Sequence, residues 1–320
     1  MSIAGRARAA IRKLALGETA LPQECTLGLI DPQTEITVWL HGAGQPIDVT
    51  QRHAPASSGP FAVCISLDKS GLPPAENRGR LSLGFRERNG QQRLLGEIGL
   101  KPGTAQFALA PDLHIFEART AANYCLPQRQ LWTHYLLHEY SHWRHPDTSG
   151  ISMSFLDKRA TIVMMIRPHP VMLASIETEG GGNIFPMNIM GDLGHDRIGF
   201  VLKESRSPAD LVGRAGRLAL TSVPVSQKAN AYRLAGNHYK QSIEWQQLPF
   251  AVRKSATFRI PVPDFALRVR ELEVETANKI GNQWFFVARV VHDENVADGP
   301  GLCMIHGFYQ AWRLKKMGVS

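Results

Sequence analysis

The amino-acid sequence predicts a mainly β protein with helical inserts, built from two β-rich domains and a helix that links them. Three observations predict this class. Most apolar runs are of strand length and end at Gly, Pro, Asn or Asp residues. Residues 126–145 have a helical pattern that contains no proline after Gln128. Strands do not alternate regularly with long helices, so a Rossmann sheet is not expected.

In the first half, short strands are separated by turn residues, most clearly at 71–79 (GLPPAENRG) and 87–92 (ERNGQQ). The expected strands are residues 26–30, 34–40, 46–51, 61–67, 79–85, 93–100, 106–110 and 113–118. The helical pattern follows, and HPDTSG at 145–150 ends it. We therefore predict a β-rich N-terminal domain, residues 1–146, which ends in a His-rich helix and whose role the sequence does not indicate.

The second half, residues 147–320, predicts a β-barrel of about eight strands with helical inserts. The inserts are expected at 207–216 (SPADLVGRAG) and around 229–246. The expected strands are residues 161–166, 171–177, 197–202, 217–225, 255–262, 266–275, 283–291 and 303–309. No short-period repeat is evident, but two β-rich halves leave a distant tandem relation open.

Charge and composition argue against several classes of protein. The net charge is +8, and residues 151–320 hold 21 basic against 15 acidic residues. The basic residues are dispersed, which favours anionic small molecules over nucleic acid as partners. No apolar run approaches the ~18 residues that span a bilayer, so no membrane partner is expected. The start of the chain lacks a signal-peptide core and the four cysteines lack C-x-x-C spacing, which indicates a reducing cytoplasm.

The stretch LLHEYSHWRH, residues 136–145, contains the H-E-x-x-H pattern of zinc hydrolases, in which Glu139 would activate a metal-bound water. Four histidines share roughly one stripe of this helix: His134, His138, His142 and His145. The polar neighbours Ser141 and Arg144, and the lack of an obvious third-ligand motif, favour a solvated or domain-facing helix. We therefore expect no metal, and a zinc hydrolase using His138, Glu139 and His142 stays open as an alternative.

Residues 167–194 (RPHPVMLASIETEGGGNIFPMNIMGDLG) predict a strand, a glycine-rich turn at 179–182 and an irregular polar segment at 183–188. Proline does not donate to a central ladder, and glycine permits close approach of a ligand to the backbone. The pattern therefore indicates a strand edge whose backbone N–H groups face a ligand. A plain hairpin explains the same residues as well.

A helix start follows in FVLKESRSPADLVGRAG, residues 200–216. Ser207 is expected at the N-cap, Pro208 at the first helical position and Asp210 at the third. Such a start presents unpaired N–H groups and a partial positive charge, which suit a phosphate. Ser205 and Arg206 would add a hydroxyl and a cation. An ordinary capped helix remains the alternative.

Together these segments, roughly residues 150–320, resemble the flavin reductase-like family of FMN-binding split barrels. The resemblance rests on a P-x-P-V-type element at 167–171, an N-x-x-P segment at 183–188, a phosphate loop at 205–210, the strand at 217–225 and the closing HGFY at 306–309. It covers about half of the chain. For residues 1–146 no family is recognised.

The resemblance implies a C-terminal split-barrel domain, residues 147–320, with FMN across a homodimer interface. The flavin ring would lie on the backbone of Pro186, Met187 and Asn188. The implied cofactor-binding residues are Asn183, Pro186, Met187, Asn188, Ser205, Arg206 and Ser207, the last three for the phosphate. The candidate catalytic residues are His169, His306 and Tyr309.

The implied function is that of an FMN-dependent oxidoreductase. It would be a NAD(P)H:flavin reductase, or a reductase or oxidase that retains its flavin and acts on a small molecule. The cofactor carries the hydride chemistry, which agrees with the absence of G-x-S-x-G and G-x-G-x-x-G motifs. A flavin- or haem-binding protein without catalytic activity is the main alternative.

Overall fold

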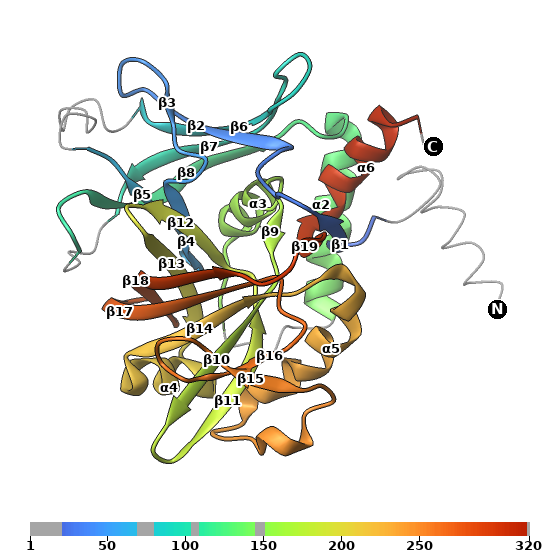
Figure 1. The fold of residues 1–320 in the computed structure, drawn as a ribbon. Helices are drawn as coiled ribbons and strands as arrows, with labels where there is room; N and C mark the ends of the chain where they lie inside the picture. The colour runs from blue at the N-terminus through green and yellow to red at the C-terminus, as the bar shows by residue number, and fades with distance from the viewer. Residues whose placement is uncertain (1–20, 69–79, 104–108, 145–150, 319–320) are drawn as a thin grey trace.

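The computed structural model describes residues 21–68, 80–103, 109–144 and 151–318, apart from the side chains of Ser141 and His142 (Figure 1). Two seven-stranded antiparallel sheets dominate it, so the predicted mainly β class with helical inserts is confirmed. Residues 1–20 and most of the expected strand 106–110 lie outside the described residues.

The first sheet is formed by the N-terminal half, in the order β3-β2-β6-β7-β8-β5-β4. Its strands are β2 (Ile36–His41), β3 (Ile47–Asp48), β4 (His53–Ser58), β5 (Phe61–Ser66), β6 (Ser82–Glu87), β7 (Leu94–Pro102) and β8 (Leu113–Asn123). In β2, Ile36, Val38 and Leu40 are fully buried and the residues between them are not. This period of two places one face of the strand in the core.

The second sheet is formed by the C-terminal half, in the order β11-β10-β14-β17-β18-β13-β12. Its strands are β10 (Met172–Thr178), β11 (Gly181–Met187), β12 (Met190–Gly194), β13 (Arg197–Lys203), β14 (Arg217–Ser222), β17 (Arg268–Ile280) and β18 (Gln283–Asn295). Helix α4 (Ser207–Ala215) connects β13 to β14 and buries Leu211 and Val212 in the core of this sheet.

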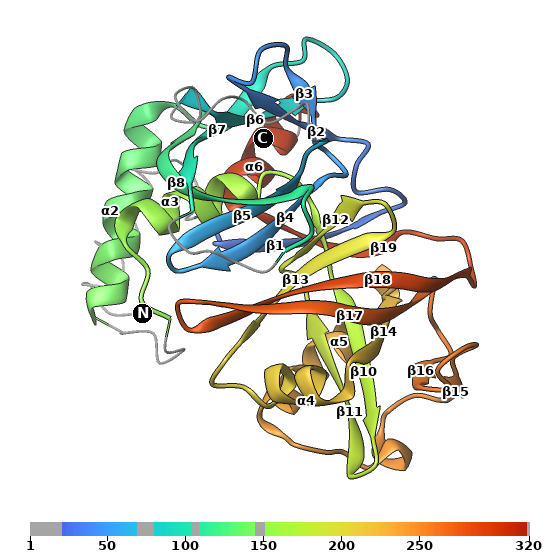
Figure 2. The ribbon, with the colours of Figure 1, turned by 90° about the vertical axis from the view of Figure 1, so that its left-hand side faces the viewer.

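The two sheets have the same strand order when each set of strands is numbered from its own beginning: second, first, fifth, sixth, seventh, fourth, third. They also meet through equivalent strands, because β4 and β5 pack against β12 and β13 (Figure 2). The contact is tight, since a Cβ added to Gly191 of β12 would lie 2.3 Å from the carbonyl oxygen of His53. The two halves therefore share one topology, in line with the tandem relation that the sequence left open.

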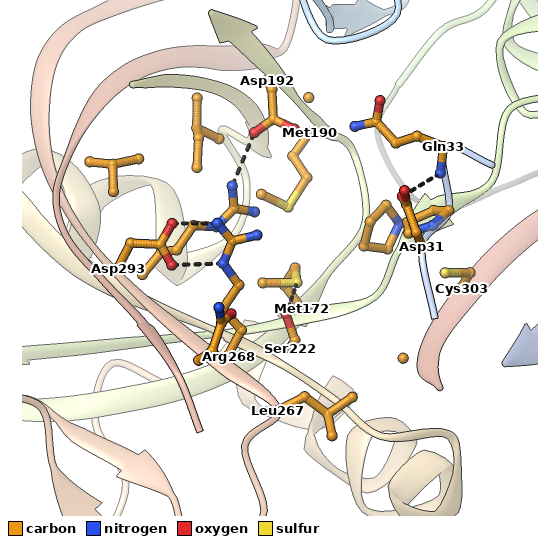
Figure 3. Close-up of a pocket in the computed structure, with 18 of the residues that line it drawn as sticks. Asp31, Gln33, Met172, Met190, Asp192, Ser222, Leu267, Arg268, Asp293 and Cys303 are labelled. Atoms are coloured by element: carbon orange, nitrogen blue, oxygen red, sulfur yellow. Dashed lines mark hydrogen bonds and ion pairs between the residues drawn. The ribbon is translucent and has the colours of Figure 1, made fainter. Parts of the chain in front are cut away.

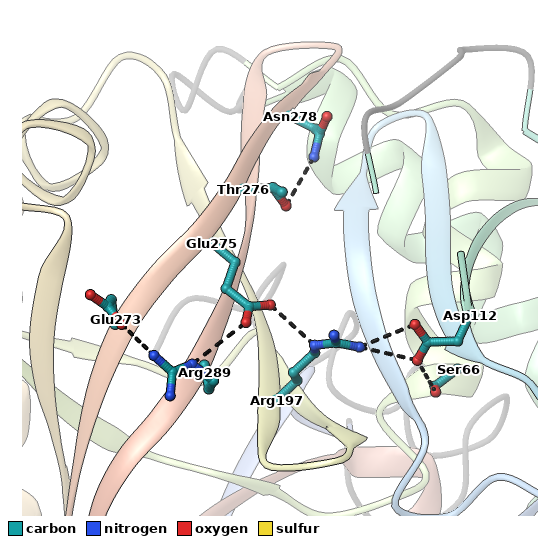
Figure 4. A network of polar contacts seen from close by, with 8 residues as sticks. All are labelled: Ser66, Asp112, Arg197, Glu273, Glu275, Thr276, Asn278 and Arg289. Carbon is teal, nitrogen blue, oxygen red and sulfur yellow. Dashed lines mark hydrogen bonds and ion pairs between the residues drawn. The ribbon is translucent and has the colours of Figure 1, made fainter. Parts of the chain in front are cut away.

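A polar network joins the halves beside this contact (Figure 4). Arg197 of β13 donates to both carboxylate oxygens of Asp112 in the first half, each at 3.1 Å. Asp112 also accepts from Ser66 at 3.2 Å. On its other side Arg197 donates to Glu275 of β17 at 3.1 Å. The network thus ties the edge of the second sheet to β5 and the start of β8.

Some elements of each half pack against the other half. Strand β1 (Glu24–Leu29) pairs with β19 (Gly301–His306), which also pairs with β9 (His169–Pro170). Helices α3 (Phe155–Met164) and α6 (Gly307–Lys316) add Val163 and Phe308 to the core of the first sheet. The predicted division at residues 146 and 147 stays a prediction, and these contacts join the two parts closely.

The expected helix at 126–145 is present as α2 (Gln128–Arg144). The remaining elements lie in the 225–263 connection: η2 (Val225–Gln227), α5 (Lys228–Arg233), η3 (Leu234–Tyr239), η4 (Trp245–Gln247), β15 (Val252–Lys254) and β16 (Pro261–Pro263). Within the described part of the chain, no helix has the length and apolar character needed to cross a bilayer.

Three expected strands are wrong, at least in part. Of the strand expected at 255–262, only residues 261 and 262 belong to a strand, β16, because residues 255–260 form the turn between the paired strands β15 and β16. Residues 161–164 belong to α3, because Ser154 and Asp157 form a reciprocal capping box that starts a helix, with Ser154 accepting from the Asp157 N–H at 3.1 Å. The strand expected at 303–309 ends at His306. There the imidazole Nδ1 accepts from the Phe308 N–H at 3.1 Å and starts α6.

Candidate functional site

A cavity of about 490 Å³ lies where the end of β11, the end of β13 and the start of α4 come together. Pro186, Met187, Asn188 and Arg206 line it, so two of the sequence segments singled out for the flavin meet at one place. The third wall comes from η3, which folds over the outer edge of β11. β11 and β13 are far apart in the strand order of the second sheet, so local sequence does not bring them together. Their convergence at the cavity is a property of the whole fold.

The segment expected to be irregular is a regular edge strand, β11, in which Pro186 faces Leu173 of β10. An edge strand tolerates proline because one side of its backbone has no sheet partner. The outward carbonyls are nevertheless occupied: Pro186 accepts from His238 Nε2 at 2.8 Å and Ile184 from Asn237 Nδ2 at 2.8 Å. The edge is therefore covered along much of its length, and β11 contributes to the cavity only from Pro186 onward.

The start of α4 differs by one residue from the expected cap. Arg206 occupies the N-cap with extended backbone, the helix begins at Ser207, and no side chain in the described part of the chain caps it. Asp210 instead pairs with Arg214 one turn later, at 2.8 Å. Pro208 has no N–H and the Ala209 N–H donates to the Arg206 carbonyl at 3.3 Å, so what the first turn offers an anion is mainly the positive end of the helix dipole.

Positive charge gathers beside this helix start. The Arg206 guanidinium lies 3.6 Å from the centre of the Tyr239 ring, and its Nη1 is buried with no hydrogen-bond partner among the described residues. Lys203 lines the same cavity. Burial lowers the pKa of His238, and the nearby Arg206 and Lys203 add to the effect. A neutral His238 can donate to the Pro186 carbonyl, while the unpartnered Nη1 suits an anionic oxygen.

The remaining residues expected to bind the cofactor lie beside the cavity rather than in its wall. Asn183 is fully buried, and its Nδ2 donates to the carbonyls of Asn237 at 3.0 Å and Lys240 at 2.7 Å. It thus anchors the covering segment to β11. Ser205 and Ser207 flank Arg206, and neither lines the cavity.

The three candidate catalytic residues are not brought together with the cavity. His169 is buried, with Nε2 3.2 Å from the Met164 carbonyl, and burial beside Arg167 lowers its pKa to about 4. His306 caps α6, and burial lowers its pKa to about 3. Tyr309 donates to Glu35 at 2.8 Å within the core of the first sheet.

Other residues of the cavity were not anticipated from the sequence. His238 and Tyr239 come from the connection that the sequence indicated only as helical, and Gln283 comes from the start of β18. The Gln283 side-chain carbonyl accepts from the Ser57 hydroxyl at 3.0 Å and the Ser58 N–H at 2.7 Å. Gln283 thereby links the cavity wall to the first half. No local motif marks these residues, since only the tertiary fold assembles them.

In the helix with the H-E-x-x-H pattern, the acidic residue Glu139 has a structural role. Glu139 forms an ion pair with Lys158 of α3 at 2.7 Å. The ring centre of His134 lies 5.2 Å from that of Phe308, and burial lowers the pKa of His134. Among the residues that the structure describes, no three His, Cys, Asp or Glu side chains are grouped to hold a metal. The side chain of His142, and His145, lie outside that part of the chain.

Flavin-related proteins are among the solved structures that are similar to part of this chain. No family model matches the sequence, and no curated protein matches it. Among solved structures, an FMN-binding protein from Thermus thermophilus is 22% identical, over 40% of this chain and 71% of its own, with a TM-score of 0.36. The styrene monooxygenase flavin reductase from Pseudomonas putida S12 is 21% identical, over 44% and 90%, with a TM-score of 0.37.

A third similar structure is the NADH:FAD oxidoreductase SgcE6 of Streptomyces globisporus C-1027. It is 12% identical, over 47% of this chain and 88% of its own, with a TM-score of 0.41. Part of the chain is thus similar to flavin reductase and FMN-binding proteins, the class of protein that the sequence motifs resemble.

Proposed function

We propose that this protein is an FMN-dependent oxidoreductase that binds FMN in the 490 Å³ cavity and uses NAD(P)H. One observation carries the proposal. The cavity combines the uncapped start of α4 with an Arg206 Nη1 that has no partner, opposite the end of β11. A phosphate would satisfy the first feature, and a planar ring against Pro186–Asn188 would fill the rest of the space.

Each part of the wall has a distinct role in this proposal. Arg206 and Lys203 supply positive charge for the phosphate, and the positive end of the α4 helix dipole adds to it. Tyr239 fixes the plane of the Arg206 guanidinium by stacking. His238 holds the end of β11 in place through the Pro186 carbonyl, so that strand presents a rigid surface to the ring.

When bound, FMN supplies the hydride chemistry between a reduced nicotinamide and a small-molecule acceptor. The protein then needs to orient the ring and exclude water more than to supply an acid or base. This agrees with the absence of His169, His306 and Tyr309 from the cavity wall. These three residues remain candidates only for indirect roles, through the packing of β9, β19 and α6.

The homodimer expected from the sequence stays a prediction, and the fold favours a different arrangement. Two sheets of the same strand order already pack through equivalent strands within one chain. Gln283 of the cavity wall is held by Ser57 and Ser58 of the first half. We infer that the N-terminal half supplies in one chain what a second subunit would supply, and that a monomer is competent to bind FMN.

Titration of purified protein with FMN, followed by flavin fluorescence, tests this proposal. Arg206→Met should weaken FMN binding about 10- to 100-fold, because it removes a charged hydrogen-bond donor. Arg214→Met is the matched control. Arg214 lies on the same helix, is 60% exposed, and contacts Asp210 and Gln241 outside the cavity, so its removal should change affinity by less than about threefold.

Oxidation of NADH and NADPH by the FMN-loaded protein decides between the enzyme and its alternative. Turnover by the monomer, separated by gel filtration, supports the full proposal. Tight FMN binding without oxidation of either nucleotide would indicate a flavin-binding protein that is not an oxidoreductase. Equal affinities of the Arg206→Met and Arg214→Met variants would contradict the assigned phosphate position.

A further inference from the structure

A larger cavity of about 1200 Å³ lies between the two halves of the chain (Figure 3). Residues 29–33 and Gln51 of the first half form part of its wall, and β10, β12, β17 and β18 form much of the rest. It is separate from the flavin cavity. Met190 lines the larger cavity and the adjacent Ile189 lines the smaller one, since successive residues of extended chain point to opposite sides.

Three arginines in the wall of this cavity are neutralised by carboxylates. Arg268 donates from Nε to Asp293 at 2.7 Å and makes a second hydrogen bond to the same carboxylate. Arg270 donates to Asp192 at 3.0 Å. Arg197 is held by the carboxylates of the network that joins the halves (Figure 4). None of the three therefore requires a ligand to balance its charge.

Arg167 is different. It lines the same cavity and is only 4% exposed, yet it makes no hydrogen bond or ion pair with the part of the chain that the structure describes. Burial lowers its pKa, and the more distant charges of Asp192 and Asp31 oppose that effect. A guanidinium nevertheless stays protonated in proteins. A buried cation without an acceptor is unfavourable, so an anion at this position would stabilise the folded chain.

The rest of the wall indicates which anion fits. Val171, Met172, Met190 and Leu267 offer apolar and polarisable surface in the wall of the same cavity. A single unpaired cation balances one negative charge, and the carboxylates of the same wall disfavour a dianion such as phosphate. We propose that this cavity binds a small organic monocarboxylate, with its carboxylate on Arg167 and its apolar part against Met172, Met190 and Leu267.

Isothermal titration of the full chain with hexanoate and benzoate tests the proposal, with hexanamide and inorganic phosphate as comparison probes. Hexanoate and benzoate should bind one per chain, and hexanamide, which has the size without the charge, should bind at least about tenfold more weakly. Arg167→Met should weaken carboxylate binding about 10- to 100-fold. Arg289→Met, an equal change of charge at a half-exposed residue outside the cavity, should leave it unchanged.

A second variant keeps the test valid if Arg167→Met does not fold. Leu267→Trp fills cavity space without altering charge, and it should also abolish carboxylate binding. Carboxylate binding that is unaffected by both substitutions would overturn the site, as would no binding by the wild-type chain. Phosphate binding more tightly than hexanoate would overturn the assigned ligand class.

This site is independent of the proposed flavin function, and FMN distinguishes the two. FMN titrated into the Arg167→Met variant should bind as it does to the wild-type chain. Carboxylate binding to wild-type protein should survive saturation with FMN. Competition between FMN and hexanoate would show that the two ligands share a cavity and would contradict a separate site.

Discussion

The two sheets share one strand order, but they differ in what surrounds them. Helices α3 and α6 and residues of α2 close the core of the first sheet, and its buried cluster includes Val163, Phe308 and Leu131. In the second sheet, α4 packs in the main buried cluster, and α5 and η3 pack on the other side of β10 and β11. The outer strand β11 lies beside the start of α4, where the 490 Å³ cavity opens.

This difference indicates a division of labour between like folds. Every described residue that lines the 490 Å³ cavity lies between Pro186 and Gln283, in the second half. The first half contributes the surface on which β12 and β13 pack and the hydrogen bonds that hold Gln283. In the first half, the strand equivalent to β11 is the two-residue β3, which is too short to form the same platform. We therefore expect one FMN site per chain.

Truncation of one core phenylalanine in each half should produce the largest effects. Phe85 and Phe286 are essentially inaccessible to solvent in the two separate cores. Phe85→Ala and Phe286→Ala should each lower the free energy of unfolding by about 3–5 kcal/mol, measured by urea denaturation. Hydrogen exchange should show that both halves lose protection together in either variant. Loss confined to the mutated half would mean that the halves fold independently.

The contact between the halves should be sensitive to a single methyl group. Gly191→Ala would place Cβ 2.3 Å from the His53 carbonyl oxygen and should lower the free energy of unfolding by about 1–3 kcal/mol. Gly180→Ala is the control, because nothing lies within 4 Å of its added Cβ. Similar thermal midpoints for the two variants would be inconsistent with tight packing of β4 on β12.

Acid should destabilise both halves through buried histidines. Burial and the nearby Arg167 lower the pKa of His53 in the first half to about 3, and of His169 in the second to about 4, from 6.5. The unfolded chain therefore binds more protons below pH 6.5. The contribution of each histidine to stability is complete above pH 6.5. As the pH falls from 6.5 toward the folded-state pKa, each histidine lowers the free energy of unfolding by about 1.4 kcal/mol per pH unit.

Urea denaturation at pH 7 and pH 5 measures this slope. His53→Leu should lower stability at pH 7, since it removes the hydrogen bond to the Val49 carbonyl at 2.6 Å, but it should also reduce the pH dependence. A wild-type slope retained in His53→Leu would exclude His53 as a source of the acid sensitivity.

The smallest expected effect is a gain in stability. Gly213 lies within α4, is exposed, and has nothing within 4 Å of an added Cβ. Gly213→Ala should raise the free energy of unfolding by about 0.5–1 kcal/mol by favouring the helix. Because Gly213 lies away from the cavity, FMN affinity should not fall. A loss of FMN affinity would show that the cavity depends on freedom of α4 to adjust.

Much of the fold follows from local sequence patterns. Alternating apolar residues predicted β2, and continuous apolar runs predicted β10, β13 and β18. Strand β4 was missed because His53–Ser58 carries small residues and Pro55, which resemble a loop. Residues 161–164 were assigned to a strand because their β-branched side chains outweighed the capping box seven residues earlier.

The site was predictable only where motifs lie close together in sequence. Pro186–Asn188 and Arg206 could be found from turn and cap chemistry. His238, Tyr239 and Gln283 reach the cavity through the order of strands in the sheet and the path of a long connection, which no local pattern specifies. In the sequence, Arg167 stands out only as the first residue of the P-x-P-V-type element at 167–171. Its lack of a partner becomes visible only when its buried surroundings are known.

The central claim is one flavin site per chain, in the second half alone. The direct measurement is the amount of FMN bound per chain after saturation and gel filtration, together with the visible absorbance before and after NADH. We expect one FMN per chain, a monomer, and loss of the flavin absorbance on reduction. Two FMN per chain would show that both sheets carry a site, and none would contradict the flavin assignment altogether.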